Sequence, residues 1–378
     1  MLTLDGLTVR PAQVWGGVRL VPLIRDEPIE GLRLEPELYE EACGVVQVDE
    51  RTCYASYIPH GFVARWSAEG VSAAYGTQLR GRTERRYLPA RMAMRFHRRM
   101  ARRADTGRLR FLPLHLAMEG YLSLHFGGPE IAWEEWSREA LRKGLSPRVE
   151  EAYHGAEIRG LEDALRIFEI HHGQCGVLLY IGDALAAAFI VPHPADYRAL
   201  HPTLLQDMYG ELLYHHAVLA TAVPDFRAAI DDARVRSLAD LRAEAARQHR
   251  EWAAFHDSAM AAGLLEGEYT VEEVYRMGPF RLSRFLPSFR RDAENHIGEI
   301  ITDQAGRPAY LKTFRLSRAQ VRRGRLLTLL AAHDWRLSAA AEALGVPEHA
   351  LGMRLEAAGL GALLRRDLLE RFRARARR

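Results

Sequence analysis

The sequence predicts an α+β protein with a β-rich N-terminal part, a mixed central domain and a small all-α C-terminal unit. Residues 1–80 contain short β-branched and apolar runs separated by Gly and Pro, and residues 176–191 hold two apolar runs joined by Gly-Asp. Residues 317–378 are dominated by Ala and Leu. The 378 residues suffice for two or three folded units, and a composition of 48% hydrophobic and 27% charged residues excludes wholesale disorder.

The first segment is expected to form strands. Leu2–Val9 and Val18–Ile24 are apolar runs of strand length, and Gly44–Val48 is a third. Pro59-His60-Gly61 separates two further runs that contain aromatic residues, which is typical of a turn between strands.

Residues 90–104 are predicted to form a basic amphipathic helix. The stretch lacks Gly and Pro, and Met92, Phe96 and Met100 recur every four residues on one helical face. The remaining circumference carries six arginines: Arg91, Arg95, Arg98, Arg99, Arg102 and Arg103. Because dense positive charge attracts phosphate backbones, these residues are predicted to bind nucleic acid. The neighbouring segments are acidic, so pairing with the protein's own carboxylates stays open as an alternative.

Acidic and histidine side chains gather around the predicted hairpin of residues 176–191. The entry and exit of a tight hairpin are neighbours, so residues before its first strand approach those after its second. The candidates for general acid–base chemistry are Glu169, His171, His172, His193 and Glu211. Their spacing matches no metal motif, so no metal is expected, and the spacing favours histidines in solvated or structural roles.

The segment Gly173-Gln-Cys-Gly, the hairpin after it, Asp196-Tyr197 and then Leu204-Leu-Gln-Asp-Met-Tyr209 together resemble the ARPP domains. These domains are named for their association with ADP-ribosylglycohydrolase and rhodanese-phosphatase genes. The resemblance implies a setting of nucleotide, ADP-ribose, RNA-repair or conflict and stress-response systems. It implies no catalytic residues and no cofactor. We extend the ARPP-like region over residues 1–262.

Residues 263–316 are interpreted as a connector with little core of its own. They contain Gly, Pro and single aromatic residues, with one strand-like run at Glu299–Thr302. The domain organisation predicted is therefore an ARPP-like region, this connector, and a C-terminal unit over residues 317–378.

The C-terminal unit resembles the Fis-type helix-turn-helix of bacterial DNA-binding proteins. Paired leucines after Leu326 are followed by Ala340-Ala341 and by Leu344-Gly345-Val346, the expected helix end and turn. The segment that would enter the major groove carries Glu348 and Glu356, which disfavours direct base reading. The predicted phosphate ligands of this unit are Arg354, Arg373 and Arg375.

Several protein classes are excluded by composition and patterning. No apolar stretch reaches the roughly 18 residues that a membrane-spanning helix needs, and no basic segment precedes an apolar core at the N-terminus. The three cysteines are odd in number and scattered, so neither a disulfide framework nor a metal cluster is expected. We therefore expect a cytoplasmic protein that makes no membrane contact.

These observations favour a nucleic-acid-associated accessory or regulatory protein that binds phosphate backbones, of DNA or RNA, through its arginine clusters. The net charge of +3 hides strong segregation, because residues 80–110 contain 12 arginines and only two acidic residues. One alternative is an enzyme that acts on a nucleotide or an ADP-ribose-like ligand through the acid and histidine candidates. Another is a homodimeric scaffold that pairs through its C-terminal helices.

Overall fold

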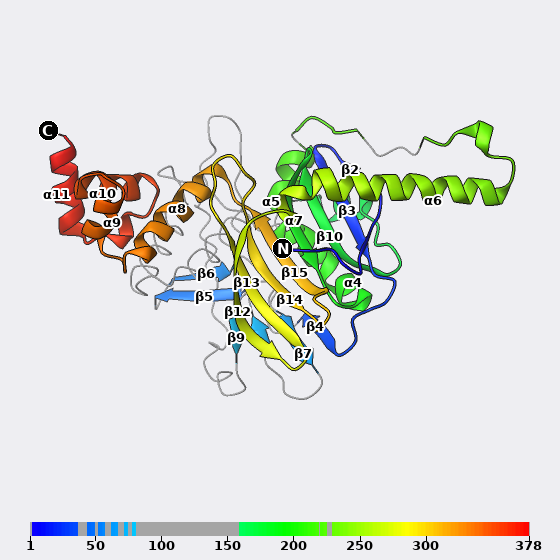
Figure 1. The fold of residues 1–378 in the computed structure, drawn as a ribbon, viewed down its shortest axis with the longest axis horizontal. Coiled ribbons are helices and arrows are strands. Elements are labelled where there is room, and N and C mark those ends of the chain that lie inside the picture. Colours follow the sequence, from blue (N-terminus) through cyan, green and yellow to red (C-terminus); the bar gives the residue numbers. More distant parts are fainter. Residues whose placement is uncertain are drawn as a thin grey trace.

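A computed structural model describes the chain over residues 2–36, 44–49, 52–56, 62–66, 72–74, 78–80, 159–218, 220–224 and 229–377. Its centre is a nine-stranded sheet, with the C-terminal helices at one end of the molecule and a long helix projecting from the other (Figure 1). The fold class is therefore α+β with a C-terminal helical unit, as predicted.

The central sheet joins segments that lie far apart in the sequence. Its order is β1-β3-β10-β11-β15-β14-β13-β12, and β2 also pairs with β3. These neighbouring strands all pair antiparallel. The strands are β1 (Thr8–Val9), β2 (Gln13–Trp15), β3 (Val18–Ile24), β10 (Gln174–Ile181), β11 (Ala184–Ile190), β12 (Tyr269–Met277), β13 (Phe280–Pro287), β14 (His296–Thr302) and β15 (Pro308–Arg315).

The hairpin of β10 and β11 occupies the middle of this sheet. Its turn is Gly182-Asp183, the dipeptide at which the sequence places it, and Gly176 pairs with Ile190 at the open end. On one side β10 pairs with β3, and on the other side β11 pairs with β15. Both strands of the hairpin are thus interior strands, which explains why they are nearly continuous apolar runs.

Each face of the sheet carries a buried apolar core. Successive side chains of a strand point to opposite faces, so Leu179 and Phe189 belong to one core while Leu178 and Ile190 belong to the other. The first core is covered by α4 (Pro194–Thr203) and the turns that follow it: η4 (Leu204–Met208), α5 (Gly210–Leu213) and η5 (Tyr214–Val218). The second core is covered by the end of α6 (Leu238–Phe255), by η7 (His256–Met260) and by α7 (Ala262–Leu265).

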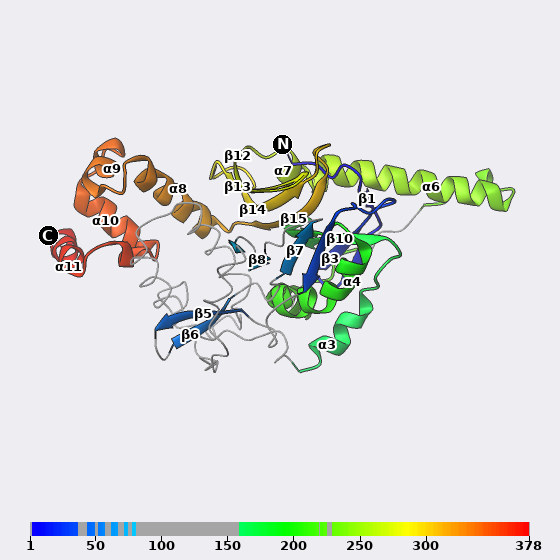
Figure 2. The ribbon, with the colours of Figure 1, turned by 90° about the horizontal axis from the view of Figure 1, so that it is seen from below.

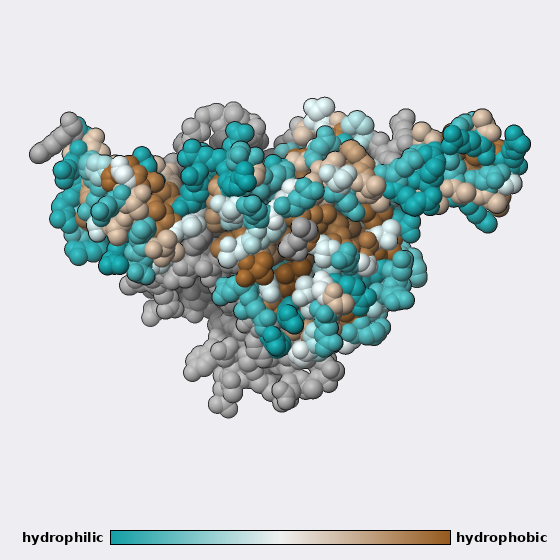
Figure 3. All heavy atoms as spheres, in the orientation of Figure 1, coloured by the Kyte–Doolittle hydropathy of each residue, from teal (hydrophilic) through white to brown (hydrophobic). Residues whose placement is uncertain are grey.

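Helix α6 leaves the body of the molecule along most of its length (Figures 1 and 2). Trp252, near its C-terminal end, is buried in the second core, whereas Leu238 at its start is 62% exposed. Hydrophilic residues cover much of the projecting end, and hydrophobic residues gather over the middle of the visible face (Figure 3).

The remaining N-terminal strands form three two-stranded sheets. They pair as β4 (Leu32–Pro36) with β7 (Phe62–Trp66), β5 (Gly44–Asp49) with β6 (Thr52–Ser56), and β8 (Ser72–Ala74) with β9 (Gln78–Arg80). Short helical turns precede the hairpin at α3 (Leu161–Ala164) and η3 (Leu165–Ile167), and another, η6 (Asp232–Arg234), precedes α6. The N-terminal part is β-rich, as expected.

The interpretation of residues 263–316 as a connector with little core of its own is wrong. They hold β12 to β15, four strands of the central sheet, and β15 lies directly beside the hairpin. Two buried charged residues interrupt the apolar pattern by which the inner strands could be predicted from the sequence: Glu299 in β14 and Lys312 in β15. Glu299 is two residues from both Ile297 and Ile301, and Lys312 is two residues from Phe314. The two charged side chains therefore share the face of the first core with these apolar residues.

The C-terminal helices follow β15 and extend the first core away from the sheet (Figure 1). The helices are α8 (Arg318–Ala332), α9 (Leu337–Ala343), α10 (Glu348–Ala357) and α11 (Arg366–Ala376), with the short turn η8 (Gly361–Leu363) before α11. Leu327 and Leu330 of α8 and Leu351 of α10 belong to the same core cluster as Phe289 and Leu316 beside the sheet. Ser317 and Gln320 form a capping box that starts α8.

Candidate functional site

The residues before the hairpin are held by a glutamine from β2. Gln13 Nε2 donates to the Glu169 carbonyl at 2.8 Å, and the Glu169 backbone N–H donates to Gln13 Oε1 at 2.7 Å. The same Gln13 Nε2 lies 3.3 Å from His171 Nε2, while His172 is exposed. The predicted candidates Glu169 and His171 are thus fixed from a distant strand.

His193, after the hairpin, caps the next helix. Its Nδ1 accepts a hydrogen bond from the Ala195 backbone N–H at 3.1 Å, at the start of α4. Glu211 lies in α5, and its side chain is outside the described part of the chain. Within that part, no hydrogen bond or ion pair joins two of the side chains of Glu169, His171, His172 and His193. Their catalytic role stays a prediction.

The polar residues of the ARPP-like pattern gather beneath α4 instead. Gln174 is buried, accepts from the His171 backbone N–H at 2.9 Å and donates to the Gly176 carbonyl at 3.1 Å. The Tyr197 hydroxyl lies 3.0 Å from His201 Nδ1, and burial lowers the pKa of His201 to about 4. His201 was not singled out from the sequence, although its i, i+4 spacing from Tyr197 is a signal for contact.

Asp196, next to Tyr197 in the same pattern, ties α4 to the N-terminal strands. Its carboxylate accepts from Arg33 Nε at 2.9 Å, from Arg33 Nη2 at 2.6 Å and from the Leu34 backbone N–H at 3.1 Å. The carboxyl group is 3% exposed. A charge-assisted, two-pronged pair of this kind fixes orientation, so Asp196 positions the helix over the hairpin.

Cys175 is a buried thiol beside a buried arginine. Arg25 donates to the Val191 carbonyl at 3.4 Å and to the Pro308 carbonyl, and burial lowers its pKa to about 10. Burial raises the pKa of the Cys175 thiol to about 11, although Arg25 opposes the effect. A thiol that stays protonated at neutral pH is a poor nucleophile, so Cys175 has a packing role.

On the opposite face, a tyrosine, a histidine and an aspartate form a chain of hydrogen bonds. The Tyr180 hydroxyl lies 2.6 Å from His256 Nε2, and His256 Nδ1 lies 2.8 Å from Asp257 Oδ1. His256 is fully buried in the π-helical turn η7, and burial raises the pKa of Tyr180. The chain links β10 to the end of α6 and thereby anchors the projecting helix.

The first core contains a further charged group that sequence reasoning missed. Lys312 is fully buried and pairs across the strands with Glu299, which is 2% exposed. The Tyr310 hydroxyl donates to Glu299 Oε1 at 2.7 Å. Burial lowers the pKa of Lys312 to about 7, and Glu299 opposes this effect. The sequence signal for a special role of Lys312 was its residue type, because the chain has 52 basic residues and only Lys143 and Lys312 are lysines.

The C-terminal unit places two short helices around a tight turn. Helix α9 ends before Gly345, whose φ of 66° is the left-handed conformation that glycine adopts without strain. The Val346 backbone N–H donates to the Ala341 carbonyl at 3.0 Å, and α10 starts after Pro347. Arg323 of α8 donates to the Ala358 carbonyl at 2.7 Å and holds the end of α10.

The predicted phosphate ligands of this unit differ in their pairing. Arg373 donates from Nε to Glu356 Oε1 at 2.8 Å, so α11 neutralises one acidic residue of α10. Arg354 and Arg375 are exposed and form no ion pair within the described residues. The other six predicted ligands, at 91–103, lie outside the described residues.

Helix α8 carries three arginines that the sequence interpretation did not select. Arg318, Arg322 and Arg325 are exposed, and their i, i+4, i+7 spacing places them on one face. The signal was that spacing, together with the lack of any acidic residue in the helix.

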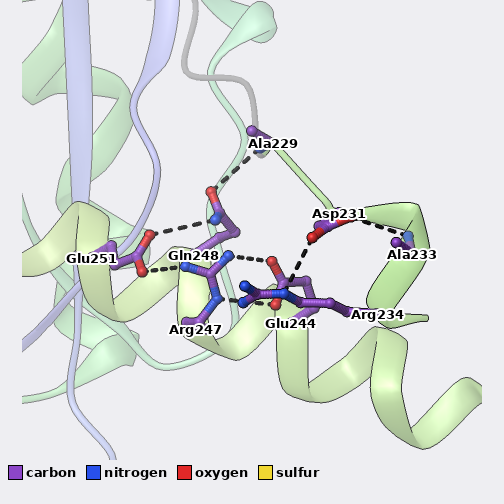
Figure 4. Close-up of polar contacts among 8 residues, drawn as sticks. All are labelled: Ala229, Asp231, Ala233, Arg234, Glu244, Arg247, Gln248 and Glu251. Atoms are coloured by element: carbon purple, nitrogen blue, oxygen red, sulfur yellow. Dashed lines mark hydrogen bonds and ion pairs between the residues drawn. The ribbon is translucent and has the colours of Figure 1, made fainter.

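Arginines in α6 and in the turn before it are paired with carboxylates (Figure 4). Arg247 donates from Nε to Glu244 Oε2 at 2.9 Å and also binds Glu251. Arg234 pairs with Asp231 at 3.1 Å in the loop that folds against the helix. Dense arginine in the sequence therefore does not by itself predict free positive charge.

Among the described residues, no group of three or more His, Cys, Asp and Glu side chains is arranged to hold a metal ion. None of the helices in the described ranges combines the length and apolar character needed to cross a bilayer.

Comparison with known proteins identifies a family. The sequence model of the ARPP-2 family matches residues 2–278, from the N-terminus to β12. No curated protein and no solved structure shows significant similarity to the chain. The match ends before the C-terminal helices and includes the hairpin, α4 and α6.

Proposed function

The chain belongs to the ARPP-2 family, and from this premise we propose that it is a nucleic-acid-associated accessory protein of a stress, repair or conflict system. It binds phosphate backbones through its C-terminal helices. In this proposal the ARPP-2 region and the strands β13 to β15 supply the folded body, and the helices after β15 supply the contact.

The observation that carries the proposal is the free positive charge of the C-terminal unit. Residues 322–378 contain 12 arginines against six acidic residues. Arg354 on α10 and Arg375 on α11 are exposed and lack a carboxylate partner within the described residues. When unpaired guanidinium groups bind phosphates, counterions condensed on the nucleic acid are released, which favours binding.

The turn between α9 and α10 supports a Fis-type helix-turn-helix as the scaffold of this contact. Glycine at the turn and Leu351 and Leu355 in the core are the features that such a unit needs. The exposed acidic residue Glu348 and the Arg373–Glu356 pair lower the positive potential of α10. We therefore propose contact with phosphates and not with base edges.

The test is fluorescence anisotropy of the full chain with labelled single- and double-stranded DNA and RNA at several salt concentrations. Wild-type protein is expected to bind with a Kd that rises steeply with salt, and Arg354→Gln/Arg375→Gln is expected to bind more weakly. The matched control is Arg242→Gln/Arg250→Gln, which removes two exposed arginines of α6. No binding by wild-type protein at low salt would overturn the proposal.

A further inference from the structure

We propose that the exposed face of α8 is a sequence-independent binding surface for a phosphodiester backbone, an inference that rests on the proposed function and locates its main contact. The surface consists of Arg318, Arg322 and Arg325, which we call the α8 stripe. All three side chains are exposed on a 15-residue helix. On the opposite face of α8, Leu327 and Leu330 pack in the first core.

The α8 stripe has no neutralising carboxylate in the part of the chain that the structure describes. Its three arginines form no ion pair within the described residues, and α8 contains no acidic residue. Several other guanidinium groups of the same unit are paired with carboxylates: Arg336 with Asp334, Arg365 and Arg371 with Asp367, and Arg373 with Glu356. The stripe is therefore a concentration of free positive charge.

The spacing of the stripe suits a row of phosphates. Seven residues separate Arg318 from Arg325, which corresponds to about 10 Å along the helix axis. Duplex DNA carries one phosphate charge for about every 1.7 Å of its axis, both strands counted, so several phosphates lie within the length of the stripe. Three guanidinium groups thus have three partners within reach.

The rest of the exposed face offers little for reading bases or for binding a protein. The exposed positions that follow are Thr328 and Ala332, and the Thr328 hydroxyl already donates to the Gly324 carbonyl at 2.8 Å. Protein interfaces are built around a buried apolar centre, which this face lacks. Charge without base-reading or apolar groups favours the phosphate backbone as the occupant.

The test compares three variants of the full chain by salt-dependent anisotropy with a labelled duplex and a labelled single strand of mixed sequence. Arg318→Gln/Arg322→Gln/Arg325→Gln is expected to lower the slope of log K against log salt by about 2 to 3, since each phosphate contact contributes about 0.7 to 0.9. Arg318→Lys/Arg322→Lys/Arg325→Lys is expected to keep the slope. Arg236→Gln/Arg242→Gln/Arg250→Gln, which removes one exposed arginine just before α6 and two on it, is the control and is expected to keep the slope as well.

The outcomes separate this inference from the proposed function. If wild-type protein binds with a steep salt slope and the α8 glutamine variant binds identically, the α8 stripe is not the contact, although the proposed function stands. If wild-type protein does not bind, both fail. If sedimentation shows that the glutamine variant loses self-association while nucleic-acid binding is unchanged, the occupant is a second copy and the inference is overturned. Far-UV circular dichroism of each variant confirms that the helix is intact.

Discussion

The ring of Phe289 lies directly against the backbone of Gly324. A Cβ atom at that glycine would come within 2.1 Å of Phe289 Cε1. Phe289 itself has a φ of 53°, an uncommon conformation for a non-glycine residue, and is buried between the sheet and α8. This contact joins the loop after β13 to the helix that carries the arginines, and so sets how the C-terminal unit sits on the sheet.

Gly324→Ala is therefore expected to destabilise the protein. Overpacking in a core costs about 1–3 kcal/mol, which exceeds the gain of about 1 kcal/mol that alanine brings to a helix interior. Urea unfolding measures the change. In Gly324→Ala/Phe289→Ala the clash is absent, so the glycine substitution should cost less there than in the wild-type background. A Gly324→Ala protein that is more stable than wild type would contradict the close contact.

Glu356→Gln is expected to strengthen nucleic-acid binding. The substitution removes the carboxylate that pairs with Arg373 and frees one guanidinium group for a phosphate. The affinity should rise severalfold at low salt, and the slope of log K against log salt should steepen by about 1. Anisotropy measures both, with Glu342→Gln as the control because it removes an exposed acidic residue of α9. Equal gains in the two variants would assign the effect to net charge instead of to Arg373.

Lys312→Met is expected to change how stability depends on alkaline pH. In the folded protein Lys312 has a pKa of about 7, below its ordinary value of 10.5, because it is buried. Between these values the unfolded chain binds the additional proton, so wild-type stability rises with pH by up to about 1.4 kcal/mol per unit. The methionine variant should lack this rise.

Urea unfolding between pH 7 and 9 isolates the Lys312 effect. The Cys175 thiol has its pKa raised to about 11, from an ordinary 9.0, and therefore acts with the opposite sign above pH 9. Parallel stability profiles for wild type and Lys312→Met over pH 7–9 would show that the lysine is charged in the folded protein.

His201→Gln is expected to reduce the loss of stability in acid. Burial lowers the folded-state pKa of His201 from its ordinary 6.5 to about 4, so between these values the unfolded chain binds the additional proton and stability falls as pH falls. Tm measured from pH 7 to 4 should decline less in the variant. Tyr197→Phe removes the neighbouring hydroxyl but leaves the imidazole buried, so it should keep the wild-type decline. A decline in His201→Gln as steep as in wild type would assign the acid loss to other groups.

Local patterns were sufficient where a segment's structure depends on its own residues. The hairpin around Gly182-Asp183 and the helices after residue 317 follow from apolar runs, turn residues and helical spacing. In residues 1–80, β3, β5, β6 and β7 follow in the same way, whereas the expected strand Leu2–Val9 is a strand only at Thr8–Val9, and β2, β4, β8 and β9 were not predicted. The ARPP resemblance was also readable from the residues around Gly173 and Tyr209, and the family match includes them.

Contacts between residues distant in the chain determined those parts of the structure that local patterns did not predict. Residues 263–316 became sheet strands because β15 pairs with β11, a contact that no local pattern records, and because Glu299 and Lys312 can be buried once they face each other. Pairing also separated the arginines. Arg373 is neutralised by Glu356, 17 residues earlier, whereas the α8 stripe has no such partner within the described residues. Composition determined how much positive charge the C-terminal unit holds, but folding decided which of it is free, because a guanidinium group is neutralised only by a carboxylate that the fold brings within a few ångströms.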